Sequence, residues 1–347
     1  MSSMYYKYEL VKAADILAGE LFGVKENETF VITADTESDA AAVDALAGAV
    51  FAKGGKPLVI WLSTPLGVSK AADPYLPLDA LTGVLLQADC WVEFNKQWLL
   101  YSSPCVTALN ENKRMRYMCL TGVGVETMVK CIGRVNYPLL NELMTMVADK
   151  VSKTKHMRMT NNTGHDISFD NGSGYPVTKE DGYARTPGIH MIAGQVAWTP
   201  VLDSINGRIV LDGSVAPGVG VVKTPVTLEV EKGNIMSVTG GNEAAQFNAW
   251  LRGFNHPQML SIAHAGFGFN PGAALCGDIL QDQRVWGSTT WGVGSIGASL
   301  LPPKGVPAPS HSDSVSLNTT VYCDGEMFLK DGIFCHTEFQ TLERKLR

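Results

Sequence analysis

The sequence lacks the features that mark several common classes of protein. No uncharged stretch approaches the ~20 apolar residues that a membrane-spanning helix needs. The first residues, MSSMYYKYELVKAAD, contain no apolar segment after a basic one, so we expect no secretory signal. Long basic runs are missing too, and 28 basic against 34 acidic residues give a net charge of −6. We therefore expect neither a membrane nor a nucleic acid as a partner.

Several sequence motifs of well-known sites are also absent. The seven cysteines are odd in number and none form a C-x-x-C pair, which indicates reduced thiols in a cytoplasmic protein rather than a disulfide framework. G-x-S-x-G, the Walker A motif and H-E-x-x-H do not occur. Serine hydrolases of the elbow type, P-loop nucleotidases and zincin peptidases therefore lose support.

What the chain does contain is enough apolar sequence for a large core. Hydrophobic residues make up 45% and charged residues 18% of its 347 residues, which is typical of an ordered protein with one large or two ordinary domains. The first part alternates β-rich and helical segments. TFVITAD (29–35) predicts a strand, and ESDAAAVDALAGAVFAKGG (37–55) predicts a helix capped by Ser38 or Thr36.

Three further apolar segments, KPLVIWL (56–62), DCWVEF (89–94) and MRYMCLTG (115–122), are typical of parallel strands buried on both faces. PLLNELMTMVADKVSK (138–153) predicts a helix that closes this half of the chain. The alternation as a whole indicates an open α/β domain over residues 1–155.

After about residue 155 the composition changes to one rich in Gly, Asn and Asp. TLEVEKGNIMSVTGG (227–241) and TTVYCDGEMFLKDGIF (319–334) predict strands joined by KGN and DG turns, and NEAAQFNAWLRGF (242–254) predicts a helix between them. The fold class we predict is therefore α/β, with the N-terminal open α/β domain followed by a mixed, strand-rich α+β domain over residues 156–347. We expect that second domain to bind a metal and carry the catalysis.

The metal prediction starts from APSHSDSV (308–315). His311 and Asp313 are two residues apart, so in a strand they share one face. His264 lies in MLSIAHAGFGF, where an apolar run meets a glycine-rich turn. Two imidazoles and one carboxylate form the facial triad of mononuclear Fe(II) oxygenases, and the same set could hold zinc with a bound water. Because single histidines in apolar runs are more often core residues than ligands, spacing alone leaves the metal site open.

Larger stretches resemble two related families. LSIAHAGFGFNPGA, GSTTWGVG and PSHSDSVSLNTTVYCDG resemble the C-terminal half of the aminopeptidase T-like metallopeptidases and of the 2,5-dihydroxypyridine 5,6-dioxygenases. GYARTPGIHMIAGQVAWTPVLDSINGRIVLDG (182–213) resembles their shared middle region, and GHD (164–166) resembles a G-x-D motif before it. The resemblance covers roughly residues 155–335, while the N-terminal half matches in layout and only weakly in residues.

The two families differ in their metal ligands. The resemblance to the aminopeptidase T-like proteins implies a two-metal site. That family has Glu where this chain has His264, His where it has Thr290, and Glu where it has Gln195. Losing these ligand types disfavours a metal pair, which needs several anionic ligands. The remaining set of His264, His311 and Asp313 is similar to that of the dioxygenases, and this resemblance implies Fe(II) as the cofactor.

The resemblance also implies residues around the metal. The dioxygenases carry an acid–base histidine in an L-L-H-S context, whereas this chain reads LLYS, so Tyr101 takes that place. A tyrosine, with a reference pKa of about 10, suits a different role from that of histidine. His190, in PGIHM, falls near a second active-site histidine of the family. His165, Asp166 and Arg284 are candidates for substrate binding, although Arg284 is as well explained by a surface ion pair.

The function implied is that of a mononuclear non-haem Fe(II) dioxygenase of the extradiol type. It would cleave a small hydroxylated N-heteroaromatic ring, similar to 2,5-dihydroxypyridine, with O2 as the second substrate, and it would form a homo-oligomer in the cytoplasm. One alternative is a metal-dependent hydrolase of the aminopeptidase T-like fold, acting on an amide, a peptide or a heteroaromatic substituent through water activated by Zn or Mn. A second alternative is a non-catalytic binding module that kept the fold.

Overall fold

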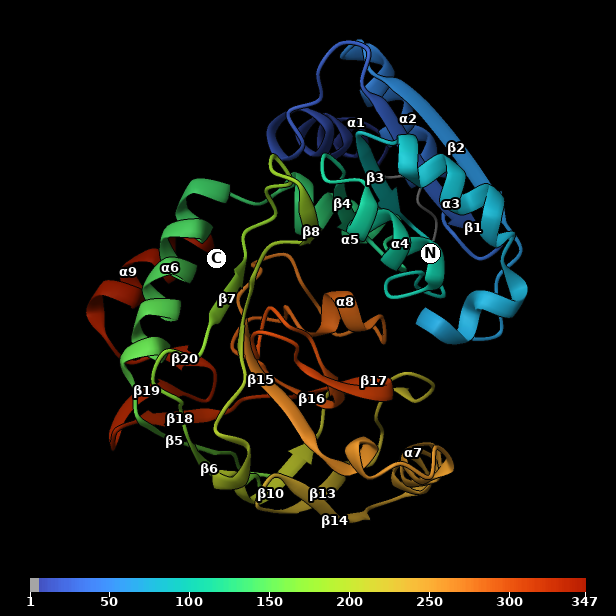
Figure 1. The fold of residues 1–347 in the computed structure, drawn as a ribbon. Coiled ribbons are helices and arrows are strands. Elements are labelled where there is room, and N and C mark those ends of the chain that lie inside the picture. Colours follow the sequence, from blue (N-terminus) through green and yellow to red (C-terminus); the bar gives the residue numbers. More distant parts are fainter. Residues whose placement is uncertain (1–5) are drawn as a thin grey trace. The chain divides into compact units, whose positions relative to one another are not determined.

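The computed structural model describes residues 6–347, which divide into two compact units (Figure 1). The first unit runs to residue 135 and also includes 180–193, whereas the second contains 136–179 and 194–347. This division differs from the predicted boundary at 155/156. The change in composition marks where strand-rich sequence begins, but the helix before it already belongs to the second unit, and a later segment returns to the first unit as a strand.

The first unit is an open α/β layer on a five-stranded sheet of order β2-β1-β3-β4-β8, in which all four strand pairs are parallel. Its strands are β1 (Thr29–Asp35), β2 (Lys56–Leu62), β3 (Cys90–Glu93), β4 (Arg116–Cys119) and β8 (Gly188–Met191). Its helices are α1 (Lys7–Asp15), the π-helical turns Ile16–Leu21 and Val129–Gly133, α2 (Ala40–Ala52), the 3-10 segment Ser69–Tyr75, α3 (Leu78–Gln87), α4 (Ser103–Glu111) and α5 (Val125–Met128).

The core of this unit explains its layering. Leu81 and Leu85 of α3 and Ala108 of α4 are buried against Trp91 and Tyr117, whose rings stack 4.0 Å apart on neighbouring strands. Burial of such large apolar side chains is the main stabilising contribution in a sheet covered by helices. These side chains form one apolar core between the sheet and helices α3 and α4.

Two local predictions for this unit were wrong. The strand β2 is parallel as expected but lies at the sheet edge and is only partly buried, because apolar composition does not distinguish an edge strand from a central one. The helix α2 is capped by Asp39 instead of Ser38 or Thr36: the Asp39 side chain accepts a hydrogen bond from the Ala41 N–H. Ser38 instead hydrogen-bonds to Asp35 and to the Phe94 carbonyl.

The second unit is strand-rich and built on antiparallel pairs in two sheets, of order β14-β13-β10-β6-β5-β18-β19-β20 and β12-β11-β17-β16-β15-β9-β7. The strands of the first of these sheets are β5 (His156–Thr160), β6 (Asp166–Asp170), β10 (Asn206–Leu211), β13 (Val226–Glu231), β14 (Asn234–Thr239), β18 (Thr320–Cys323), β19 (Glu326–Lys330) and β20 (Ile333–Phe334). The second contains β7 (Val177–Glu180), β9 (Gln195–Trp198), β11 (Ser214–Ala216), β12 (Gly220–Val221), β15 (Ile262–Gly268), β16 (Thr289–Ile296) and β17 (Val306–Ser316).

The helices of this unit are α6 (Tyr137–Lys153), α7 (Asn242–Gly253), α8 (Ile279–Asp282), α9 (Thr337–Leu346) and the 3-10 turns Leu202–Ser204 and Pro257–Leu260. The predicted hairpins β13–β14 and β18–β19–β20 are present with their turns. The predicted fold class, an open α/β part followed by a mixed strand-rich part, is thus confirmed. The helix expected to close the first half is α6, which belongs to the second unit instead.

Within residues 6–347, no helix combines the length and the apolar character that crossing a bilayer requires. The seven cysteines are all free thiols, and five of them are buried.

Candidate metal centre

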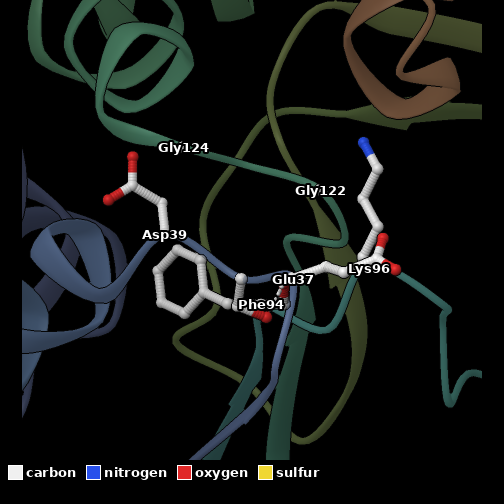
Figure 2. A pocket seen from close by; sticks show the side chains of 7 residues that line it. Glu37, Asp39, Phe94, Lys96, Gly122 and Gly124 are labelled. Carbon is white, nitrogen blue, oxygen red and sulfur yellow. Dashed lines mark hydrogen bonds between the residues drawn. The ribbon is translucent and has the colours of Figure 1, made fainter. Parts of the chain in front are cut away.

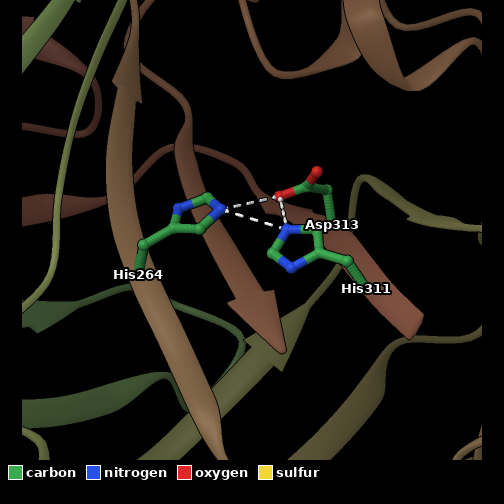
Figure 3. Close-up of side chains that lie close together, drawn as sticks. All are labelled: His264, His311 and Asp313. Carbon is green, nitrogen blue, oxygen red and sulfur yellow. Dashed lines mark hydrogen bonds and ion pairs between the residues drawn. The ribbon is translucent and has the colours of Figure 1, made fainter. Parts of the chain in front are cut away.

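Three predicted ligands meet on one face of the seven-stranded sheet of the second unit. His264 projects from β15, and His311 and Asp313 project from β17, with β16 between these strands. The Nε2 atoms of the two histidines are 3.3 Å apart, and Asp313 Oδ1 lies 3.1 Å from His264 Nε2 and 3.3 Å from His311 Nε2 (Figure 3). One donor atom from each residue lies within 4.8 Å of the others, which is the spacing that a single metal ion needs.

Hydrogen bonding prepares this cluster to act as a ligand set. The Ser295 carbonyl lies 2.8 Å from His311 Nδ1 and can only accept, so Nδ1 carries a proton and neutral His311 presents the Nε2 lone pair to the cluster. Asp313 Oδ1 is buried and faces the Nε2 atoms of both imidazoles. Three lone-pair atoms this close repel one another unless a cation or a proton lies between them. The residues present therefore fit a metal ion.

The charges in the cluster are strongly coupled. Burial alone would raise the pKa of Asp313, but the neighbouring imidazoles hold it well below its usual range. Burial alone would lower the pKa of His311, yet the Asp313 carboxylate and the Ser295 carbonyl raise it above its usual range. The site thus favours an ionised carboxylate and positive charge beside it, which a proton or a divalent cation can supply.

Two of the residues predicted to bind substrate, a role that stays a prediction, have hydrogen-bond partners within the second unit. His165 is 1% exposed, its Nδ1 accepts a hydrogen bond from the Val210 N–H, and its ring centroid is 5.7 Å from that of Trp291. Asp166 is exposed and makes two hydrogen bonds of 2.8 Å to the Arg158 guanidinium. Burial lowers the pKa of His165 to about 4, and the Arg158 hydrogen bonds lower the pKa of Asp166.

Arg284 is fully buried, so the alternative of a surface ion pair is wrong for this residue. Its Nη1 donates to the Leu280 carbonyl at 2.7 Å and to Gln283 Oε1 at 3.3 Å. These bonds tie the guanidinium to α8 and its C-terminal residues. A role for Arg284 in binding substrate stays a prediction.

The two predicted acid–base residues, Tyr101 and His190, belong to the first unit. Tyr101 follows β3 in a loop, with a φ of 68°, a left-handed conformation that is rare for a bulky residue. Its side chain is 49% exposed. Backbone strain of this kind in a non-glycine residue often accompanies function.

The loop before Tyr101 is held by a buried carboxylate. Glu93 Oε2 accepts from the Leu99 N–H at 2.8 Å, and its Oε1 accepts from the Tyr117 hydroxyl at 2.7 Å and the Cys119 thiol at 2.8 Å. Burial raises the pKa of Glu93, and these hydrogen bonds counteract the effect only in part. Glu93 could not be singled out from the sequence, because a glutamate at the end of an apolar strand is more often solvated.

His190 lies on β8 and is half-buried. Its Nε2 donates to the Thr186 carbonyl at 2.8 Å, because a carbonyl can only accept. Neutral His190 therefore keeps Nδ1 as a proton acceptor, which suits the base that the sequence predicts.

A small cavity of about 120 Å³ opens at the carboxyl ends of β1, β3 and β4 in the first unit (Figure 2). Its lining consists of Glu37, Ser38, Asp39, Phe94, Lys96, Gly122 and Gly124. The Asp39 carboxylate accepts from the N–H groups of Ala41 and Val125, each at 3.0 Å, and so occupies the N-termini of two helices. The position that an anion would take is filled by the protein itself, so we assign no ligand to this cavity.

Sequence reasoning missed two residues that shape the metal centre. One is Ser295, whose backbone carbonyl orients His311 and has no signature in the sequence. The other is Gly292, which lies opposite both His264 and Asp313 in the sheet. A glycine inside the β-rich segment GSTTWGVG is a recognised signal of close approach by another group, and it could have been read that way.

Comparisons with known proteins first define the fold. A solved structure of 2,5-dihydroxypyridine dioxygenase from Pseudomonas putida KT2440 is similar to 98% of this chain and 99% of its own, with a TM-score of 0.76 and 20% identity. Wild-type AmpT from Thermus thermophilus is similar to 95% of this chain and 100% of its own, with a TM-score of 0.71 and 13% identity. At these identities the likeness shows the fold, a two-unit architecture common to a dioxygenase and AmpT.

Sequence comparison then narrows the family. The family model described as NicX, 2,5-dihydroxypyridine 5,6-dioxygenase, matches residues 18–336, so the chain belongs to this family. A curated 2,5-dihydroxypyridine 5,6-dioxygenase from Pseudomonas putida (strain KT2440) is 34% identical over 139 residues. That alignment covers 39% of this chain and spans 39% of the relative's length.

Proposed function

We propose that this protein is a mononuclear Fe(II) dioxygenase of the extradiol type that opens a small hydroxylated N-heteroaromatic ring such as 2,5-dihydroxypyridine. The observation that carries the proposal is the cluster of His264, His311 and Asp313, in a member of the 2,5-dihydroxypyridine 5,6-dioxygenase family. His264, His311 and Asp313 would hold the Fe(II), which would supply the redox chemistry for a reaction with O2.

The protein's own residues contribute charge, orientation and proton transfer. Asp313 stays ionised beside the two imidazoles, so it offers negative charge to a dication at neutral pH. The Ser295 carbonyl fixes the tautomer of His311 and thereby directs Nε2 toward the cluster. In this proposal His190 accepts a proton at Nδ1, and the Tyr101 hydroxyl donates a hydrogen bond or a proton to the substrate.

Reconstitution and oxygen uptake test this function. The chain is freed of metal, loaded anaerobically with Fe(II), and mixed with 2,5-dihydroxypyridine in an oxygen-electrode cell. We expect one O2 consumed for each ring lost, with loss of the ring absorbance. Product formation without O2 uptake, supported by Zn or Mn, would assign the chain to the hydrolase alternative.

Single-residue variants test the ligand set. His264→Ala, His311→Ala and Asp313→Ala should each abolish turnover and bound iron while leaving the fold intact. His156→Ala is the matched control, since His156 is an exposed histidine of the same unit that pairs with Asp170. Near-normal turnover in any ligand variant with reduced metal content would contradict the assignment. The cytoplasmic location and the homo-oligomeric state are part of the same proposal and are tested by fractionation and light scattering.

A further inference from the structure

The ligand strands β15 and β17 are not neighbours, because β16 runs between them. Adjacent strands are about 4.8 Å apart, so ligands two strands apart must reach across roughly twice that distance. Even so, His264 Nε2 comes within 3.1 Å of Asp313 Oδ1. Figure 3 shows the side chains converging from the two outer strands across the strand in between. The imidazole must therefore lean over β16 instead of standing upright on its own strand.

One residue of β16 lies in register with both ligands. Gly292 pairs with His264 on one side and with Asp313 on the other. A Cβ atom placed on Gly292 would overlap Cδ2 and Nε2 of His264 and would lie 2.9 Å from its Cε1. The ring thus occupies the space that any side chain at position 292 would need.

The backbone conformation does not require glycine at this position. Gly292 has no positive φ, and the three nearest atoms to an added Cβ all belong to the His264 ring. The next glycine of the same strand differs, because Gly294 has a φ of 101° and its Cβ would approach the Ser310 carbonyl at 2.6 Å. Gly294 is required by the chain, whereas Gly292 is required by the imidazole.

We propose that Gly292 is a positioning residue for the metal centre. Because it has no side chain, the His264 ring can lie over it, and this placement brings Nε2 to the ligand cluster. The proposal rests on the proposed function, in that these three residues hold the metal. In Gly292→Ala the flexible element is the imidazole, so the ring moves away and the site is left with two ligands.

Metal affinity is the first readout. The full-length protein is stripped with a chelator and titrated with Co(II), whose visible absorption reports its ligands. We expect Gly292→Ala to bind Co(II) at least tenfold more weakly than the wild type, as is typical when the support of a ligand is lost. Gly253→Ala is the control, because a Cβ there meets nothing within 4 Å and the φ is ordinary. Wild-type affinity in Gly292→Ala would overturn the proposal.

A double-mutant cycle on the metal-free protein separates this proposal from the metal assignment. If the ring and the added methyl compete for one space, Gly292→Ala lowers the unfolding midpoint in the wild-type background and has no such effect in the His264→Ala background. An equal loss in both backgrounds, or failure of both alanine variants to fold, shows that the methyl clashes elsewhere and refutes the role. Wild-type protein that binds no Co(II) while the cycle still shows coupling would refute the metal site and leave the steric pairing established.

Discussion

His165 allows a quantitative test of whether a buried histidine stabilises the core or binds the substrate. Its Nδ1 accepts from the Val210 N–H at 3.1 Å, and burial lowers its pKa to about 4. An unfolded histidine has a pKa of about 6.5. At pH values between these two pKa values, the unfolded chain binds a proton at this histidine and the folded chain does not.

The sign and size of the effect follow from linkage. Because the folded-state pKa is depressed, the stability is fully present above pH ~6.5 and is lost as the pH falls toward 4. The full difference corresponds to about 3 kcal/mol, of which about 2 kcal/mol is lost between pH 7 and pH 5. His165→Asn removes the titration but keeps a side-chain oxygen that can accept from Val210. We therefore expect the wild type to lose about 2 kcal/mol more than this variant over that range.

The assay is urea unfolding of metal-free protein at pH 7, 6 and 5, followed by circular dichroism, so that metal binding does not contribute. His156→Asn serves as the control, since it makes the same substitution at an exposed histidine of the same unit. Equal slopes for the wild type and His165→Asn would refute the reasoning. If the variant then showed a raised KM for 2,5-dihydroxypyridine, His165 would be the substrate ligand that the sequence predicted.

Three further predictions concern the other candidate residues. Tyr101→Gly should raise the free energy of unfolding by about 1 kcal/mol by relieving the left-handed strain, and both Tyr101→Gly and Tyr101→Phe should lower turnover. Full turnover of the Phe variant would remove the phenol from the mechanism. Asp166→Asn should lower the free energy of unfolding by no more than about 1 kcal/mol, because its ion pair with Arg158 is exposed. We expect an unchanged KM in steady-state kinetics, whereas a tenfold higher KM would support a role in substrate binding. Acidification should release the metal, because the raised pKa of His311 lets protons compete with the metal for this ligand. Below that pKa the Co(II) affinity should fall by about tenfold per pH unit, and an affinity independent of pH would contradict the prediction.

The fold was predictable where local chemistry decides it. Thr29–Asp35 is a strand as expected, because a β-rich apolar run between turn residues has few alternatives. The hairpin over Val226–Thr239 also followed from alternating residues around a Lys-Gly-Asn turn, with a positive φ at both Lys232 and Gly233.

Long-range placement was not predictable in the same way. Residues 180–193 return to the first unit and add β8 to the edge of its sheet, beside β4. Nothing in the local pattern of this segment distinguishes a strand of one sheet from a strand of the other. The edge position of β2 was hidden for the same reason, since pairing partners and not composition decide exposure.

The site divides along the same line. That His311 and Asp313 share a face followed from their spacing in a strand. That His264 joins them could be predicted only from a likeness to known motifs, because His264 and His311 are 47 positions apart in the sequence. The strand between them also needs a residue without a side chain at Gly292. A sequence states which residues can bind a metal, but the order of strands decides which of them meet.

The fold alone does not decide the function, since it is shared with a dioxygenase and with AmpT. Gln195 and Thr290 stand where the resemblance places additional ligands. Thr290 pairs with Gly266, and a Cβ on Gly266 would lie 3.6 Å from Gln195 Nε2, so both are close to that residue of β15. Both are buried and neutral, and the part of the chain from residue 6 onward contains one cluster of three metal-binding side chains. A second dication would find no anionic ligand at these two positions, so we expect the protein to bind one metal ion and not to cleave peptides through a metal pair.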